Sequence, residues 1–199
     1  MRRKLLAMDL DGTAVADDYS MSASSKNAII RLQEAGHIVS FVSGRRDVDM
    51  LSLGDDQWLA DYHILNNGGK IIRCKDRQVL YNKTIDADAS RRLIEYCLEE
   101  DLQLHVVNGL VWQVSKITPG TLEYAGELNV MPGIFKSVKD VKWENLEGFM
   151  ASSDWEPIAH YIDNSVPEMI YVHSEPGVID IMAEGLRKWD GICTLADCL

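Results

Sequence analysis

The sequence has no basic stretch, no long apolar run and no paired cysteines, and each absence argues against a class of protein. Of its 199 residues, 31 are Asp or Glu and 20 are Lys or Arg, so the net charge is −11 at pH 7. Nucleic-acid-binding proteins carry a basic patch, and we therefore expect no nucleic-acid partner. The acidic balance also repels anions at long range, so a phosphate site would need local positive charge.

No segment approaches the apolar length of a transmembrane helix, and we expect no membrane partner. The basic start of the chain is followed only by the short apolar segment 5–8 before Asp9, which is too short for the hydrophobic region of a signal peptide. The cysteines lack the Cys-x-x-Cys spacing of a zinc site, which favours free thiols in a cytoplasmic protein. These residues are Cys74, Cys97, Cys193 and Cys198.

The chain begins with a short apolar segment that ends in two carboxylates. Residues 5–8 are apolar without alternation, which predicts a strand buried on both faces. Asp9 and Asp11 follow, at the end where open α/β sheets bind ligands. Gly12 permits a turn with positive φ. Two neighbouring acids can share a Mg²⁺ ion, one acting as nucleophile and the other as general acid/base. An ordinary Asp-Gly turn or a Ca²⁺ loop remains the alternative.

The next segments predict a parallel β-α-β unit. Ser22 or Ser24 can cap a helix that runs to about Ala35, and residues 37–42 form the following strand. That strand ends in the tripeptide 43–45, Ser-Gly-Arg. A serine hydroxyl and backbone N–H groups at such a position can hold a phosphate oxygen, although a helix cap is the plainer explanation for the serine.

The middle of the chain has a different pattern. Residues 62–65 predict a third strand, which an Asn-Asn-Gly-Gly turn follows at 66–69, and 70–73 with 78–81 predict a hairpin. From about residue 84 the pattern becomes α+β: helices at 87–100 and 155–162, an Asn-Gly hairpin across 102–114, and another hairpin across 169–182. We therefore expect a core made of 1–83 and 184–199, with 84–183 inserted as a second domain.

Residues 9–13, Asp-Leu-Asp-Gly-Thr, resemble the first motif of the haloacid dehalogenase-like (HAD) phosphatases, and Ser43-Gly44-Arg45 stands where the second motif of that family falls. The resemblance implies a Rossmann-like core with an inserted cap, as in the Cof-type, sugar-phosphatase-like branch. It also implies a small phosphorylated metabolite as substrate and Mg²⁺ as cofactor. In these enzymes the cap closes over the site and selects the leaving group.

The resemblance also assigns roles to individual residues. Asp9 would be the nucleophile, Asp11 the general acid/base, and both would be metal ligands. Lys188 stands at the place of the third-motif lysine, which neutralises the phosphate and the nucleophile. The implied phosphate- and substrate-binding set adds Leu10, Gly12, Ser43, Gly44, Arg45 and Asn67.

The family's fourth motif, Gly-Asp-x-x-Asn-Asp, does not occur before the sequence ends at Leu199. We therefore expect a core that is incomplete at the C-terminus and a Mg²⁺ ion held by Asp9, a backbone carbonyl of Asp11 and water. The missing strand would leave the apolar edge of the first strand uncovered, which would favour self-association through it.

Two functions stay open at this point. The first is Mg²⁺-dependent hydrolysis of small phosphate monoesters through an aspartyl-phosphate. The second is a truncated, catalytically impaired HAD-like protein that at most binds phosphate ligands. A phosphate-accepting receiver domain also clusters Asp residues after strands, but the large insert argues against it. No residue pattern identifies the substrate.

Overall fold

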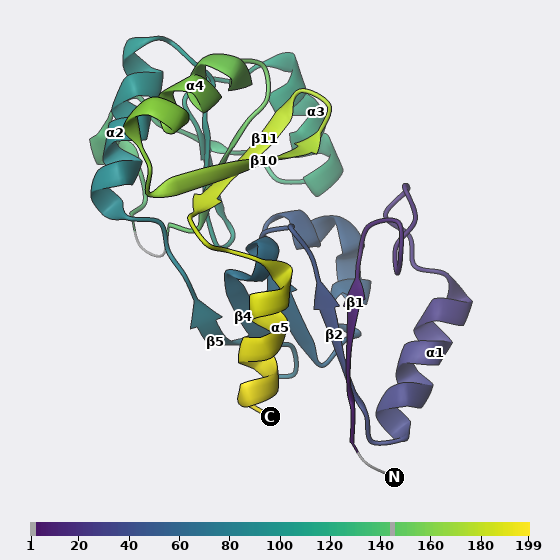
Figure 1. The fold of residues 1–199 in the computed structure, drawn as a ribbon. Coiled ribbons are helices and arrows are strands. Elements are labelled where there is room, and N and C mark those ends of the chain that lie inside the picture. The colour runs from purple at the N-terminus through teal and green to yellow at the C-terminus, as the bar shows by residue number, and fades with distance from the viewer. Residues whose placement is uncertain (1–2, 144–145) are drawn as a thin grey trace. The chain divides into compact units, whose positions relative to one another are not determined.

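The computed structural model describes residues 3–143 and 146–199, and the chain divides into two compact units. Unit 1 consists of Met1–Asn82 and Leu186–Leu199, and unit 2 is Lys83–Gly185. The boundaries expected from the sequence, 83/84 and 183/184, lie within two residues of this division. Each unit is built around its own sheet (Figure 1).

The sheet of unit 1 has the strand order β1-β2-β3-β4-β5. The first three strands, β1 (Leu5–Asp9), β2 (Ile38–Val42) and β3 (Tyr62–Leu65), are parallel. The hairpin of β4 (Lys70–Arg73) and β5 (Gln78–Asn82) continues the sheet in antiparallel fashion. This arrangement confirms the predicted α/β class, and it brings the carboxyl ends of the three parallel strands to one end of the sheet.

Helices cover both faces of this sheet. One face packs against helix α1 (Ala23–Glu34) and the 3₁₀ segment η1 (Asp49–Trp58), and the other packs against helix α5 (Lys188–Asp197). Neighbouring strand residues alternate between the two faces: in β2, Phe41 joins the first apolar cluster and Val42 joins the second. Leu195 on α5 is fully buried in the second cluster, which anchors this helix to the sheet.

The prediction for the first strand was wrong in its burial. Leu5, Leu6 and Met8 are only partly buried, and Ala7 is exposed. The reason is the position of β1, which pairs only with β2 among the described residues and is therefore an edge strand. An unbroken apolar run is typical of a central strand, but it does not determine how many neighbours the strand has.

Unit 2 is a six-stranded sheet with the order β10-β11-β9-β6-β7-β8. Its strands are β6 (His105–Asn108), β7 (Val111–Val114), β8 (Gly133–Ile134), β9 (Gly148–Ala151), β10 (Met169–Glu175) and β11 (Val178–Ala183). Its helices are α2 (Ala87–Glu99), α3 (Pro119–Leu128) and α4 (Trp155–Ser165), and a short 3₁₀ turn η3 covers Val138–Asp140. All neighbouring strands are antiparallel except β7 and β8.

The structure confirms both predicted hairpins of this unit but adds two elements that the sequence pattern did not indicate. Strand β9 pairs with β6 and β11 and so joins the two hairpins into one sheet. With four residues, all of them buried, it shows no periodicity. Helix α3 contains two glycines, which weaken a helical signal, and it is fixed instead by a capping box between Thr118 and Thr121. Within residues 3–143 and 146–199, no helix has the length and apolar character needed to cross a membrane.

Candidate active site

The turn after β1 is fixed by a single buried residue. The carbonyl oxygen of Leu10 accepts hydrogen bonds from the backbone N–H groups of Thr13, Ala14 and Val15, at 2.9–3.1 Å. The Leu10 side chain is fully buried, so only its backbone is available to a ligand. Gly12 has a φ of +70°, a conformation that side chains other than Gly rarely adopt. The tight turn leaves Asp9 and Asp11 exposed at the end of the strand.

Lys188 forms an ion pair with Asp9. Its ammonium nitrogen Nζ donates a hydrogen bond to Oδ1 of Asp9 at 2.8 Å. The two side chains are 43% and 45% exposed, so the pair stands open to a ligand from solvent. The first-motif and third-motif candidates of the sequence therefore meet, at the end of β1 and the first residue of α5.

Two glycines permit α5 to lie close enough for this contact. The backbone after β3 passes through three residues with positive φ, Asn66, Asn67 and Gly68. A Cβ atom on Gly68 would collide with the carbonyl oxygen of Arg187, and one on Gly191 would lie 2.8 Å from the Cα of Gly68. The turn and the first turn of α5 are thus in direct backbone contact, which fixes the start of the helix that carries Lys188.

Arg45 binds the second carboxylate. Its Nε and Nη2 atoms donate to Asp11, with the shortest contact at 2.7 Å, and its Nη1 donates to the carbonyl oxygen of Asp49 and the hydroxyl of Ser52. The guanidinium also lies over the ring of Tyr19, 5.0 Å from its centroid. Burial lowers the pKa of Arg45, but the hydrogen bond and the charge of Asp11 outweigh it, so the pKa is raised overall. The guanidinium group of Arg45 therefore stays charged, and its two-pronged contact holds Asp11 in one orientation.

Ser43 lies directly after β2 and is buried. Its hydroxyl is 3.5 Å from Oδ2 of Asp11, a weak contact, and it accepts a hydrogen bond from the backbone N–H of Arg45 at 3.1 Å. The hydrogen bond from Arg45 N–H is the cap-like interaction that the sequence left open as an alternative. Ser43 therefore stabilises this turn, and its hydroxyl also faces the carboxylate of Asp11. Asn67 lies beside Gly44, and its backbone N–H donates to the carbonyl of Ser43.

Two buried ion pairs near this site were not predicted as part of it. Arg46 pairs with Asp49 at 3.0 Å, and Lys70 pairs with Asp47 at 2.7 Å. Their side chains are at most 16% exposed, so these charges are fixed rather than solvated. Asp49 therefore links the two arginines, through its carboxylate to Arg46 and through its carbonyl to Arg45. The three-residue spacing of Arg46 and Asp49 could have indicated their pair, whereas no sequence pattern relates Lys70 to Asp47.

The described residues bring the predicted set together as two neighbouring ion pairs, Asp9 with Lys188 and Asp11 with Arg45. Carboxylate oxygens are the donors that Mg²⁺ prefers, and this ion keeps several waters in its shell. Residues 3–143 and 146–199 contain no cluster of three or more His, Cys, Asp or Glu side chains placed for a metal. Asp9 thus fits Mg²⁺ as a carboxylate donor and Asp11 as a donor through its backbone carbonyl, because the carboxylate of Asp11 is bound by Arg45. The remaining positions are open to water or phosphate oxygens.

Comparisons with known proteins give two curated phosphatases as relatives of this chain. The chain is 26% identical over 119 residues to the HMP-PP phosphatase of Enterobacter sp. (strain 638), a match that covers 60% of this chain and 43% of that protein. It is 29% identical over 103 residues to the 5-amino-6-(5-phospho-D-ribitylamino)uracil phosphatase YwtE of Bacillus subtilis (strain 168), which covers 52% of this chain and 35% of the relative. The matches thus span less than half the length of these relatives.

The fold matches solved structures over almost its whole length. A haloacid dehalogenase-like hydrolase from Bacteroides thetaiotaomicron superimposes with a TM-score of 0.86 at 17% identity, covering 98% of this chain and 77% of that chain. The profile of the haloacid dehalogenase-like hydrolases matches residues 6–199. Because this profile covers nearly the whole chain and the fold agrees with it, the chain belongs to the haloacid dehalogenase-like hydrolase family.

Proposed function

We propose that this chain carries the catalytic residues of a Mg²⁺-dependent phosphatase that hydrolyses small phosphate monoesters, of the sugar-phosphate kind, through an aspartyl-phosphate on Asp9. The observation that carries the proposal is the 2.8 Å contact between Lys188 Nζ and Asp9 Oδ1, beside Asp11. A cation beside the attacking oxygen lowers the repulsion between a carboxylate and a phosphate dianion. The names of the two relatives, both phosphatases of small phosphorylated molecules, support a substrate of that broader class.

In the first half of the reaction, a carboxylate oxygen of Asp9 attacks phosphorus and forms an O–P bond, while the bond from phosphorus to the ester oxygen breaks. Asp11, in its protonated form, gives its proton to the leaving oxygen. Lys188 and the hydroxyl of Ser43 bind the phosphoryl oxygens while charge moves onto them. Arg45 orients Asp11 through the bidentate contact.

In the second half, Asp11 is a carboxylate and removes a proton from a water molecule. The water oxygen attacks phosphorus, the acyl-phosphate bond breaks, and inorganic phosphate and the Asp9 carboxylate are regenerated. Mg²⁺, held by the carboxylate of Asp9 and the backbone carbonyl of Asp11, would supply positive charge that lowers the repulsion between the nucleophile and the phosphate. We assign the choice of leaving group to unit 2, as the resemblance to the Cof-type branch implies.

The test is hydrolysis of p-nitrophenyl phosphate by the purified chain with and without MgCl₂. We expect Mg²⁺-dependent turnover that Asp9→Asn reduces by at least about a thousandfold, as the loss of a nucleophile does in other enzymes. Asp17→Asn, which makes the same change at a nearby exposed position, is the matched control and should keep full activity. Borohydride reduction during turnover should convert Asp9 to homoserine, which mass spectrometry identifies.

Either of two results would overturn the proposal. The first is an absence of phosphate release above the buffer rate at saturating Mg²⁺. The second is an Asp9→Asn variant that is as active as the starting chain, because the activity would then come from another group or a contaminant.

A further inference from the structure

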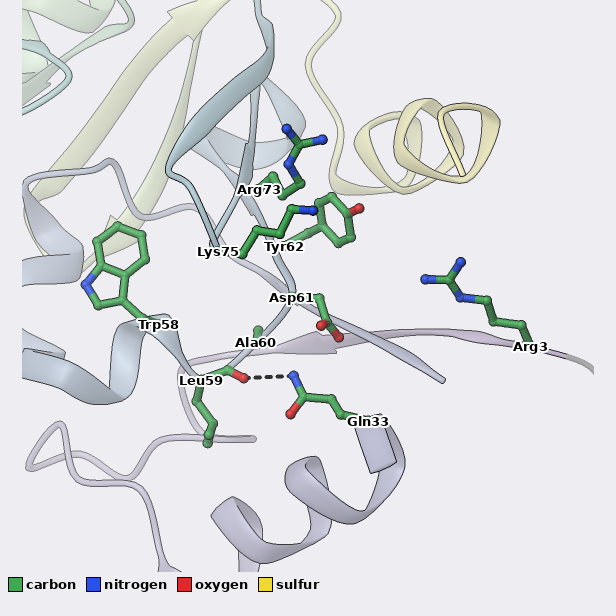
Figure 2. A pocket seen from close by; sticks show the side chains of 9 residues that line it. All are labelled: Arg3, Gln33, Trp58, Leu59, Ala60, Asp61, Tyr62, Arg73 and Lys75. Carbon is green, nitrogen blue, oxygen red and sulfur yellow. Dashed lines mark hydrogen bonds between the residues drawn. The ribbon is translucent and has the colours of Figure 1, made fainter. Parts of the chain in front are cut away.

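Unit 1 contains a cavity of about 380 Å³ that the proposed reaction does not use (Figure 2). Tyr62, the first residue of β3, and Arg73, the last residue of β4, line it. Asp9 and Ser43 lie at the opposite ends of their strands. Because a strand rises about 3.3 Å per residue, the length of β1 alone separates the two sites by roughly 13 Å. The cavity is therefore a separate feature.

The charge of the lining is opposite to that of the chain. Three basic side chains, Arg3, Arg73 and Lys75, line the cavity against one carboxylate, Asp61. The whole chain, in contrast, carries 31 acidic and 20 basic residues. A local positive charge on an otherwise acidic protein attracts small anions to that place, while the surrounding negative surface repels them.

The acidic residue of the lining, Asp61, forms no ion pair with these cations among the described residues. Oδ2 of Asp61 accepts a hydrogen bond from the backbone N–H of Val39 at 2.9 Å, so one oxygen of this carboxylate is bound to strand β2. Figure 2 shows Arg3 approaching from the N-terminal end of the chain and Lys75 from the β4–β5 turn, with Asp61 and Tyr62 between them. Neither Arg3 nor Lys75 forms a hydrogen bond or an ion pair with another residue in the described part of the chain.

The third cation is fixed in place. Arg73 donates to Asp76 at 2.8–3.2 Å and also to Gln78, and it stands directly across from Tyr62 in the β3–β4 pair. Cross-strand partners on one face lie within contact distance, so the guanidinium and the phenol share one wall. The phenol hydroxyl makes no hydrogen bond with the described residues and remains a free donor.

The aromatic part of the lining does not offer a stacking surface. One face of the Trp58 ring is stacked on His63, with centroids 5.4 Å apart, and Arg77 lies over the ring at 4.6 Å. His63 and Arg77 thus lie against the Trp58 ring, where a nucleobase would otherwise stack. The cavity therefore selects by charge and hydrogen bonding rather than by stacking on tryptophan.

From this arrangement we propose that the cavity is a second anion site that binds a phosphate dianion, as inorganic phosphate or as the phosphate group of a small metabolite. A planar carboxylate fills one guanidinium fork, whereas a tetrahedral dianion accepts bonds from several directions at once. Here the donors are the ammonium of Lys75, the guanidinium of Arg3 and the hydroxyl of Tyr62, which come from three separate segments. Because Arg73 is paired with Asp76, the charges that remain in the lining are those of Arg3, Lys75 and Asp61, and their net positive charge favours an anion.

The experiment titrates the ¹⁵N-labelled chain with inorganic phosphate and follows the amide signals by NMR. We expect saturable shifts at residues 61–62 and 73–75 and at the indole N–H of Trp58. The double variant Arg3→Gln/Lys75→Gln should weaken this binding at least about tenfold, the effect of losing a charge-assisted hydrogen bond. Arg31→Gln/Lys139→Gln removes the same charge from two exposed positions elsewhere and should leave the affinity unchanged.

A second titration, with phenylphosphonate, distinguishes the two sources of the phosphate group, because its organic part cannot be released by hydrolysis. Tighter binding than inorganic phosphate assigns the site to a metabolite, and equal or weaker binding assigns it to inorganic phosphate. The absence of saturable shifts at these residues, or shifts that the double variant leaves unchanged, would overturn the proposal. Lys188→Met should not affect this binding, so failure here is separable from failure of the phosphatase proposal.

Discussion

The ammonium nitrogen of Lys188 lies 2.8 Å from Oδ1 of Asp9, although 179 positions separate the two residues in the sequence. All of unit 2 is inserted between them. The contact therefore depends on the two segments of unit 1 folding together, which the apolar packing of Leu195 with Val42 and Ile64 provides. The geometry of the nucleophile is in this way a product of the tertiary fold and not of any local motif.

Removing the ammonium group of Lys188 should reduce the catalytic rate far more than the free energy of unfolding. For Lys188→Met we expect kcat/KM to fall about 10²- to 10³-fold, because a preorganised charge at the phosphoryl group is lost. The pair is more than 40% exposed on both sides, so its contribution to the free energy of unfolding is below about 1 kcal/mol. Lys26→Met, which breaks a comparably exposed ion pair with Asp56, is the matched control. A similar loss of activity in both variants would contradict a specific role for Lys188.

The close contact between the turn after β3 and helix α5 leads to a second prediction, on the substitution of Gly191. A Cβ at position 191 would lie 2.6 Å from Cγ2 of Ile64, so Gly191→Ala must displace either the helix or the strand. We expect the free energy of unfolding to fall by about 1–3 kcal/mol, as for other overpacked sites, together with a lower kcat because Lys188 moves. Urea denaturation and initial rates measure the two effects. Gly126→Ala, in α3, meets no atom within 4 Å and should be neutral or slightly stabilising.

The bidentate contact of Arg45 with Asp11 should matter through geometry as well as charge. Arg45→Lys keeps the charge but loses the planar fork, and lysine cannot reach Asp11, Asp49 and Ser52 together. We expect kcat to fall about tenfold to a hundredfold with a smaller change in KM, because misplaced general acids reduce the chemical step. A variant with unchanged kcat and raised KM would instead indicate that Arg45 binds the substrate directly.

Much of the fold of both units was predictable from the sequence. The strand–helix–strand start, the turn at 66–69 and both hairpins of unit 2 follow from short-range patterns, namely apolar runs, Asn-Gly turns and serine caps. The grouping of Asp9, Ser43 and Lys188 was an expectation from family resemblance. No periodicity in this sequence relates Lys188 to Asp9, because the backbone approach of Gly68 and Gly191 that brings them together is a tertiary contact.

The features that the sequence did not predict correctly also depend on tertiary contacts. The segment 5–8 is as apolar as a central strand, and it was expected to be buried on both faces, but burial depends on how many strands flank it. The contacts of Arg45 were likewise not foreseen: the resemblance places Arg45 in the phosphate-binding set, and the structure shows its guanidinium bound by Asp11, Asp49 and Ser52. Side-chain partners of this kind become visible only when the turn geometry is known.

The four thiols should differ in their reactivity. Burial and the nearby charge of Asp61 raise the pKa of Cys74 to about 12, and burial also raises the pKa of Cys97. At pH 8 only about one Cys74 thiol in ten thousand is then ionised. We expect iodoacetamide to modify the exposed Cys193 and Cys198 of the native protein and to leave the two buried thiols intact, whereas all four should react in urea. Peptide mass spectrometry gives the order, and early labelling of Cys74 would contradict it.

The buried imidazole of His63 should make the stability of unit 1 depend on pH. Burial lowers its pKa below the usual value of 6.5, although a hydrogen bond with the carbonyl of Gln57 partly opposes this, and the ring is stacked between Phe41 and Trp58. Below pH 6.5 the unfolded chain binds a proton that the folded chain does not. The free energy of unfolding should therefore decrease as the pH falls below 6.5, by up to about 1.4 kcal/mol per pH unit from this group.

Urea denaturation at pH 7.5 and pH 5.5 measures this effect, and other groups contribute to it as well. The comparison that isolates His63 is the variant His63→Gln, which keeps an amide donor for Gln57 but cannot bind the proton. Its loss of stability between the two pH values should be smaller than that of the starting chain. His160→Gln, at an exposed position, should retain the full pH dependence. If both variants show the same dependence as the starting chain, the imidazole of His63 is not the group whose protonation is coupled to unfolding.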